Sequence, residues 1–254
     1  MVGSFKTAIS LCRSLMAYIS VSLWVVMVGP PGMVLAILFK WPEILYLLGR
    51  IGVRIGLRIV GIRYRVFGKE NIQCHRASVY CVNHSSNVEP PILYMALSVL
   101  HPGLKILYKA EIHRLPVLSR AFDIVGFVPI ERQNREQSSG ALEKAAASLR
   151  AGNSFLIFPE GTRSLTGSLQ RFKKGGFIMA IKGRAPIIPV AIQGTRAAMS
   201  KGSLVMRPVT VNVRLGKPVE LNGEDLDQRD QLMLETRSRV EELLFNRPVS
   251  DRED

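Results

Sequence analysis

A histidine and a carboxylate stand five positions apart in the stretch VNHSSNVEPP, residues 82–91. The imidazole of His84 titrates near neutral pH and can take a proton from an alcohol. If Glu89 accepts a hydrogen bond from the other ring nitrogen, it fixes the tautomer and stabilises the imidazolium. The pair can meet only if His84 lies in a turn and Glu89 in the first turn of a helix. In the alternative interpretation, His84 is a plain turn residue and Glu89 only favours the positive end of a helix.

A second stretch, FPEGTRS at residues 158–164, has the composition of an anion site. The guanidinium of Arg163 can bind a phosphate through two parallel hydrogen bonds. Gly161 would let backbone N–H groups approach the anion closely. The alternative is an ordinary loop with a surface arginine. Two segments between the motifs, YKAE at 108–111 and GFVPIER at 126–132, each place a cation at a strand end.

The composition limits the class of partner. Hydrophobic residues make up 47% of 254 residues, and the formal net charge of +14 indicates an anionic partner such as a membrane surface, a phosphorylated substrate or nucleic acid. Aromatic residues are only 7%, and neither a zinc-finger spacing nor an Arg/Lys-dense tail is present, so nucleic acid is disfavoured. Three scattered cysteines and four histidines without ligand spacing predict a reducing compartment and no metal site.

The N-terminal third has the composition of a membrane segment. No charged residue occurs from Ser14 to Phe39, a run long enough to cross a hydrocarbon core of ~30 Å. The sequence Gly-Pro-Pro-Gly at residues 29–32 interrupts this run, and adjacent prolines break a helix. Two structures fit: one kinked transmembrane helix, or a helical hairpin that dips into one leaflet and returns. We expect the hairpin.

A basic stripe follows this apolar run. Arg50, Arg54 and Arg58 recur every four residues among Ile, Leu and Val, so they share one face of a helix. Such a face fits an anionic lipid surface better than it fits the solvated side of a soluble helix. We therefore expect residues 1–63 to anchor the chain and residues 64–254 to form the second domain.

The second domain alternates between predicted strands and helices, which is typical of a layered α/β fold. Function in such sheets gathers at the loops after the carboxyl ends of strands, and both His84 and Arg163 follow predicted strands. Strands are predicted at residues 64–67, 77–82, 104–108, 124–130, 154–158, 185–192 and 209–215, and helices at 90–100, 138–149 and 224–245.

Four motifs in this order, NH(X)4E, GFVPIER, FPEGTRS and IIPVAI, resemble the 1-acylglycerol-3-phosphate acyltransferase family of the glycerophospholipid acyltransferase superfamily, over residues 65–215. The resemblance implies a mixed, mostly parallel sheet flanked by helices. It implies that His84 is the general base, that Glu89 orients it, and that Pro189 shapes the acyl or acceptor pocket. The family's motif usually ends in aspartate, and here the acid is Glu89. The glycerol-phosphate site implied by the resemblance comprises Arg132, Glu160, Gly161, Thr162 and Arg163, with Lys109 as a further contact.

The activity that the resemblance implies is acyl transfer to the sn-2 hydroxyl of lysophosphatidic acid, giving phosphatidic acid for phospholipid biosynthesis. Acyl-CoA or acyl carrier protein would supply the acyl thioester, with no cofactor and no covalent acyl-enzyme. Cys81 as a nucleophile is disfavoured because it lies in an apolar strand. The expected location is the cytoplasmic face of a bacterial inner membrane. The alternatives are another lyso-lipid acceptor, a non-catalytic lipid-binding protein, or, from charge alone, a nucleic-acid binder.

Overall fold

The computed structural model describes residues 2–131, 135–221, 223 and 226–245. A seven-stranded sheet with the strand order β1-β7-β6-β2-β5-β3-β4 forms its centre. Every neighbouring pair is parallel except β6 and β7, which are antiparallel, so the predicted mixed and mostly parallel sheet is confirmed. The strands are β1 Arg63–Phe67, β2 Val79–Val82, β3 Leu104–Lys109, β4 Val128–Ile130, β5 Ser154–Ile157, β6 Ile187–Gln193 and β7 Thr210–Leu215.

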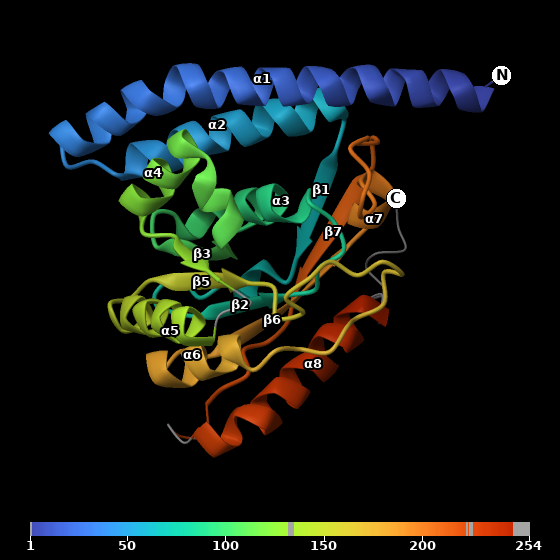
Figure 1. The fold of residues 1–254 in the computed structure, drawn as a ribbon. Helices are drawn as coiled ribbons and strands as arrows, with labels where there is room; N and C mark the ends of the chain where they lie inside the picture. The colour runs from blue at the N-terminus through green and yellow to red at the C-terminus, as the bar shows by residue number, and fades with distance from the viewer. Residues whose placement is uncertain (1, 132–134, 222, 224–225, 246–254) are drawn as a thin grey trace.

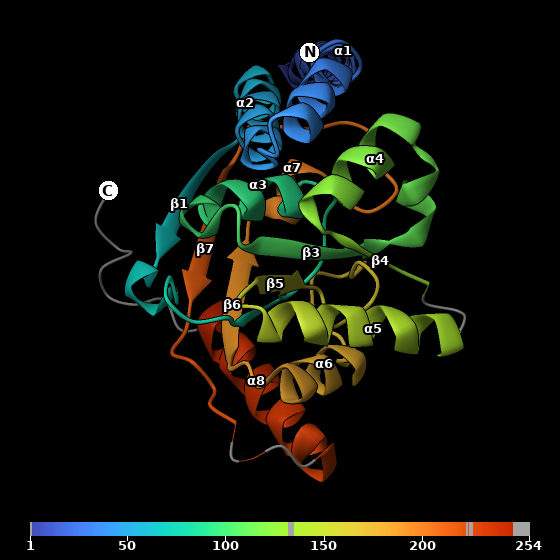
Figure 2. The same ribbon diagram turned by 90° about the vertical axis from the view of Figure 1, so that its left-hand side faces the viewer.

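Helices cover both faces of this sheet (Figures 1 and 2). One face carries α1 Val2–Leu38, α2 Glu43–Val60, α3 Glu89–Ala96 and α4 Pro116–Val125, and the other carries α5 Arg135–Arg150, α6 Gly175–Gly183 and α8 Arg229–Phe245. The short α7, Thr195–Ala198, follows β6 at the edge of the sheet. Single 3₁₀ turns occur at Lys69–Asn71, Ser98–Leu100, Ala110–Arg114 and Leu226–Gln228.

Strand β2 separates two apolar cores, because successive side chains of a strand point to opposite faces. Tyr80 and Val82 pack in the core beneath α3. Val79 and Cys81 pack in the core on the side of α5 and α6. All four residues are buried, which explains the continuous apolar run before His84.

The N-terminal hairpin exists, but the predicted break at residues 29–32 is wrong. Helix α1 continues through Pro30 and Pro31 to Leu38, and the chain reverses at residues 39–42, where Lys40 has a φ of 50°. The two glycines serve close packing instead of a turn. A side chain at Gly32 would collide with Leu48 of α2, and one at Gly29 would come within 2.9 Å of Val117 of α4.

Helix α1 is long and apolar enough from Lys6 to Leu38 to cross a membrane, by length and composition, and it is the one such helix in the described part of the chain. Many of its apolar side chains face away from the protein: Leu15 is 61% exposed and Leu38 is 71% exposed. This surface supports association with a membrane.

Other predicted boundaries are wrong as well. The helix predicted at 90–100 ends as α3 at Ala96, and a 3₁₀ turn follows it. The predicted strand at 124–130 begins only at Val128, because residues 124–125 end α4. The predicted helix at 224–245 begins at Arg229 after a 3₁₀ turn, and residues 224–225 lie outside the described part. The sequence interpretation also missed α4 and α6, although Pro116 in the first turn of α4 and Gly126 just beyond its end are ordinary helix boundary signals.

Candidate active site

His84 and Glu89 meet as the motif predicted. Strand β2 ends at Val82, His84 lies in the following turn, and α3 begins at Glu89. The distance between His84 Nδ1 and Glu89 Oε2 is 2.6 Å, and the Glu89 side chain is fully buried while that of His84 is 13% exposed. A carboxylate oxygen only accepts, so the proton of this hydrogen bond is assigned to Nδ1. The neutral imidazole therefore carries its lone pair on Nε2.

Three further donors hold the Glu89 carboxylate. The peptide N–H of Ser85 lies 3.0 Å from both carboxylate oxygens, and the Ser85 hydroxyl donates to Oε1 at 2.8 Å. The hydroxyl of Thr195, the first residue of α7, donates to the same oxygen at 2.6 Å. A buried carboxylate needs such partners because an unsatisfied buried charge is costly. Together they fix the oxygen that faces His84.

The sequence interpretation missed Ser85 and Thr195. Ser85 stands beside His84 in the motif, so its hydroxyl was a visible signal. Thr195 is 106 residues away from Glu89 along the chain, and only the pairing of β2 with β6 brings it near.

The imidazole ring is held from one side by Phe158, whose ring stacks on it at a centroid distance of 4.2 Å and an angle of 29°. Nε2 of His84 makes no hydrogen bond to any residue that the structure describes. The ring is therefore fixed in place, with one nitrogen available to a substrate hydroxyl.

Glu160 fixes the backbone of the same histidine. One oxygen of its carboxylate accepts the peptide N–H of His84 at 2.7 Å, and the other accepts that of Gln170 at 3.1 Å. The peptide N–H of Ser164 donates to the carbonyl of His84 at 2.7 Å. Burial raises the pKa of Glu160, and the two peptide donors oppose that rise. This placement favours a positioning role over the direct contact with glycerol phosphate that the resemblance implied.

The predicted phosphate loop is bonded to the backbone of this histidine through Ser164, the residue after Arg163. Arg163 is half-buried, and its guanidinium makes no hydrogen bond to a described residue. Its backbone is held instead: Lys201 Nζ donates to the Arg163 carbonyl at 2.9 Å and lies 3.4 Å from the Thr162 hydroxyl. Gly161 has a φ of 70°, and a Cβ there would lie 2.7 Å from the Lys173 side chain. Glycine therefore lets the turn form with Lys173 packed on it.

Of the remaining predicted residues, Lys109 and Pro189 lie on strands of the sheet. Lys109 ends β3 at the same edge as the end of β2, but its ammonium pairs with Glu111 at 2.5 Å. Arg132 lies outside the described residues. Pro189 is buried in β6 in register with Cys81, and its carbonyl accepts the N–H of Gly216 at 2.8 Å. Among the described residues, no three His, Cys, Asp or Glu side chains gather to hold a metal ion.

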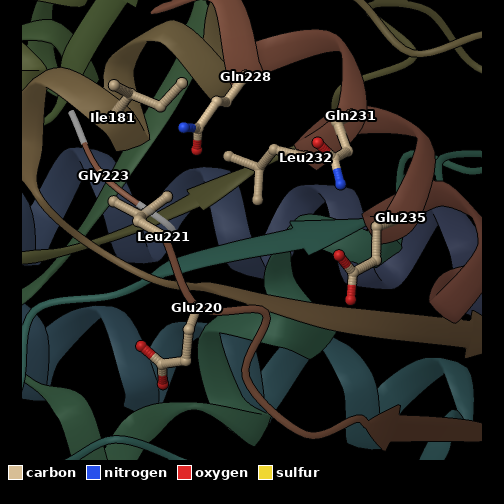
Figure 3. Close-up of a pocket in the computed structure, with 8 residues that line it drawn as sticks. All are labelled: Ile181, Glu220, Leu221, Gly223, Gln228, Gln231, Leu232 and Glu235. Carbon is tan, nitrogen blue, oxygen red and sulfur yellow. The ribbon is translucent and has the colours of Figure 1, made fainter. Parts of the chain in front are cut away.

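Two cavities are lined by residues that lie next to His84 or Glu89 in the sequence. An apolar cavity of about 360 Å³ lies between the α1–α2 hairpin and helices α3 and α4, and its lining includes Pro91, Tyr94 and Trp24. A more polar cavity of about 840 Å³ is lined by Ser85 and Thr195 among others. A hollow of only about 20 Å³ between α6 and α8 is lined by neither motif (Figure 3).

Known proteins are similar to this chain in sequence and in fold. A sequence model described as "Acyltransferase" matches residues 63–193, just over half of the chain. The chain is 28% identical over 204 residues to the 1-acyl-sn-glycerol-3-phosphate acyltransferase of Limnanthes douglasii, covering 78% of this chain and 71% of the relative. A protein of the same name from Borreliella burgdorferi is 28% identical over 170 residues, covering 67% of each chain.

A solved structure matches almost the whole chain. It is the crystal structure of the 1-acyl-sn-glycerophosphate (LPA) acyltransferase, PlsC, from Thermotoga maritima, with a TM-score of 0.76 and 25% identity, covering 94% of this chain and 98% of that one. Fold and motifs together place the protein in the acyltransferase class. The chain belongs to the 1-acylglycerol-3-phosphate acyltransferase family, as its motifs predicted.

Proposed function

We propose that the chain moves a fatty acyl group from an acyl thioester to the sn-2 hydroxyl of lysophosphatidic acid, giving phosphatidic acid in phospholipid biosynthesis. The observation that carries this proposal is the His84–Glu89 pair. Its Nδ1 is hydrogen-bonded, its ring is stacked on Phe158, its Nε2 bonds to no described residue, and its backbone is bonded to the loop of Arg163. The names of the relatives support the acceptor, and both acyl-CoA and acyl carrier protein suit as donors.

The geometry supports direct transfer with His84 as general base. Nε2 takes the proton of the sn-2 hydroxyl as its oxygen attacks the thioester carbonyl, and the buried Glu89 stabilises the imidazolium that forms. When the tetrahedral intermediate collapses, the C–S bond breaks, and the thiolate takes the proton back from Nε2. The product ester and the free thiol leave, and the histidine returns to its neutral form.

A covalent intermediate on Cys81 is disfavoured by its position. Its side chain packs in the core on the side of α5 and α6, whereas His84 stacks on Phe158, which packs against the opposite core. Burial raises the pKa of the Cys81 thiol, with the charge of Glu160 adding to the rise. The thiolate that would act as a nucleophile is therefore suppressed.

Arg163 is the residue that we assign to the acceptor phosphate. Its guanidinium is not used by the described residues, and its loop is bonded to the peptide of His84. A phosphate bound there through two hydrogen bonds would bring the glycerol hydroxyl near Nε2. Gly161 and Thr162 support the loop, and Lys109 and Arg132 stay predicted contacts.

The apolar cavity suits the acyl chain. It is lined almost entirely by hydrocarbon and aromatic side chains, and its lining includes Pro90 and Pro91, the two residues after Glu89. One wall is the α1–α2 hairpin, which would lie in the membrane. An acyl chain could therefore pass from lipid to the reaction site without crossing water.

The function is tested by thiol release from purified protein in lipid, with acyl-CoA and acyl carrier protein as donors and a panel of lysophospholipids as acceptors. We expect release with lysophosphatidic acid and none with the His84→Ala variant. Thiol release with a different lysophospholipid only would show that lysophosphatidic acid is not the acceptor. Thiol release that persists in the His84→Ala variant would contradict the proposed mechanism.

We also propose that the α1–α2 hairpin enters one leaflet only, so that both ends of the chain face the cytoplasm. The antiparallel packing of α1 on α2 supports this arrangement (Figure 1). Reporter cysteines at Ser4 and Glu242, in a Cys12→Ser and Cys74→Ser background, should react from the same side of sealed vesicles. Reaction from opposite sides would establish a full span instead.

A further inference from the structure

We propose that the loop of residues 200–208, between α7 and β7, is a second lipid-contact element, in which Leu204 enters an anionic bilayer surface beside α1. The segment between α7 and β7 rises toward the underside of α1, below the N-terminal half of that helix (Figure 1). The same loop holds the phosphate loop through Lys201, so it connects the membrane surface with the reaction site.

Helix α1 holds the loop through the backbone. The peptide N–H of Met206 donates to the Ser14 hydroxyl at 2.8 Å, and the Tyr18 hydroxyl donates to the Leu204 carbonyl at 2.9 Å. Ser14 is buried, with 3% of its surface exposed, whereas its neighbour Leu15 is 61% exposed. The loop is therefore fixed to a helix whose outer side chains need a lipid environment.

Leu204 is directed away from the protein. Its side chain is 74% exposed, although its carbonyl is bonded to α1. A leucine side chain stabilises a structure only when its apolar surface is removed from water. Here the fold holds Leu204 at the surface and leaves its side chain uncovered. The neighbouring helix α1 is apolar and long enough to lie in a membrane. Lipid that covers α1 would therefore also cover Leu204.

The charges around Leu204 favour an anionic surface over an aqueous protein partner. Residues 200–208 contain Lys201 and Arg207 and no acid, and α1 contains Lys6 and Arg13 and no acid. Arg13 and Pro208 also border the same glycine, Gly61 at the end of α2. Basic side chains that flank an apolar one are the pattern of an interfacial lipid contact.

The other end of the loop contacts the reaction site. Lys201 donates to the Arg163 carbonyl at 2.9 Å, and the Ser86 hydroxyl donates to the Met199 carbonyl at 2.6 Å, just before the loop. Insertion of Leu204 would therefore set the height of the phosphate loop above the membrane. A lysophospholipid headgroup would meet Arg163 at the depth where it leaves the bilayer.

The test places an environment-sensitive fluorophore on the full chain, in a Cys12→Ser and Cys74→Ser background that leaves only the buried Cys81. Leu204→Cys is labelled and reconstituted into vesicles of phosphatidylethanolamine and phosphatidylglycerol that carry brominated lipid. Leu15→Cys, on the exposed face of α1, is the positive control. Leu234→Cys is the matched negative control, because Leu234 is also an exposed leucine, at 64%, but lies on α8 below the sheet (Figure 1).

We expect brominated lipid to quench the fluorophore at position 204 about as strongly as at position 15, and to leave position 234 unchanged. Quenching at 204 no stronger than at 234 would overturn the proposal, and a signal at 204 that rises with protein concentration alone would assign the surface to a second copy of the chain. Replacing phosphatidylglycerol with phosphatidylcholine should weaken the quenching at 204, and equal quenching would overturn the anionic part. None of these readouts depends on acyl transfer.

Discussion

The Glu89→Gln variant probes the His84–Glu89 pair most directly, because it keeps the shape of the side chain and removes its charge. Each hydrogen-bond partner of the Glu89 carboxylate in the described part of the chain donates to it: His84 Nδ1, the Ser85 peptide and the hydroxyls of Ser85 and Thr195. A glutamine must place an NH₂ group, itself a donor, against one of these. Either orientation of the amide disturbs the pair.

The two orientations fail in different ways. With the NH₂ toward His84, Nδ1 must become the acceptor, so the proton moves to Nε2 and the ring can no longer take one from the substrate. With the amide oxygen toward His84, the tautomer survives, but no negative charge stabilises the imidazolium in a fully buried site. We expect kcat to fall by about two to four decades, which is about 3–5 kcal/mol, with little change in acceptor KM.

The assay is thiol release by purified, folded variants in lipid, with kcat and acceptor KM measured separately. His84→Ala should fall at least as far, and the double variant should be scarcely worse, because residues that act as one unit are non-additive. Thr195→Val is the matched control: it removes one hydrogen bond to Glu89 and leaves His84 intact, so a loss of about 1 kcal/mol, several-fold in kcat, is expected. Glu89→Asp should keep substantial activity if the turn closes by about one bond length.

A near-wild-type kcat in Glu89→Gln would refute this reasoning. Glu89 would then act only at the start of α3, and another group or none would support His84. A fall in Thr195→Val as large as that in Glu89→Gln would equally refute it, because a neutral donor would then matter as much as the charge.

Three other outcomes are expected. Arg163→Ala should raise acceptor KM by about one to two decades, the loss of a bond worth roughly 1.5–3 kcal/mol. Arg163→Lys should also be impaired because it loses the fork, and an acceptor titration with unchanged KM would remove Arg163 from this role. Lys201→Met should raise acceptor KM several-fold with kcat nearly unchanged, since it frees the phosphate loop, and equal kinetic constants would contradict that coupling. Because the pKa of Glu160 is raised, its carboxyl keeps a proton in the folded state at pH values above its ordinary pKa of 4.5. The protonated Glu160 therefore contributes to the free energy of unfolding at low pH, and this contribution is lost as the pH rises through the pKa of the folded state. Denaturant unfolding across this range should show wild type losing stability relative to Glu160→Gln, and a constant difference would argue against the shift.

The sequence predicted the sheet better than the helices. The buried apolar runs before His84 and before Pro159 form β2 and β5. A short, continuous run of apolar, β-favouring residues in an α/β fold is typical of a central strand that is covered on both faces. The break at Pro30 and Pro31 failed because the proline rule is local. A proline inside a helix costs about 3 kcal/mol, and the packing of α1 on α2 and α4 offsets it at Gly29 and Gly32. That packing involves residues far along the chain, which no local rule sees.

The candidate site divides in the same way. The meeting of His84 with Glu89 was predictable, since both lie in one turn whose ends are fixed by a strand and a helix. The hydroxyl of Thr195 was not, because the neighbour relation of β2 and β6 brings it there. Glu160 shows a third case. The residue was picked out by its motif, but its direction, inward to the peptide of His84, depends on the path of the loop.

The double attachment of His84 to the phosphate loop affects how the site opens. The loop bonds both the N–H and the carbonyl of the same peptide segment, through Glu160 and Ser164. Local unfolding of the loop would therefore release the backbone of the base at the same moment, and the two motifs form one cooperative unit. A bound acceptor phosphate that reduced the motion of the loop would also reduce the motion of His84. If the loop opened while no acceptor was bound, His84 would lose its fixed position and would be less able to promote attack of water on the thioester.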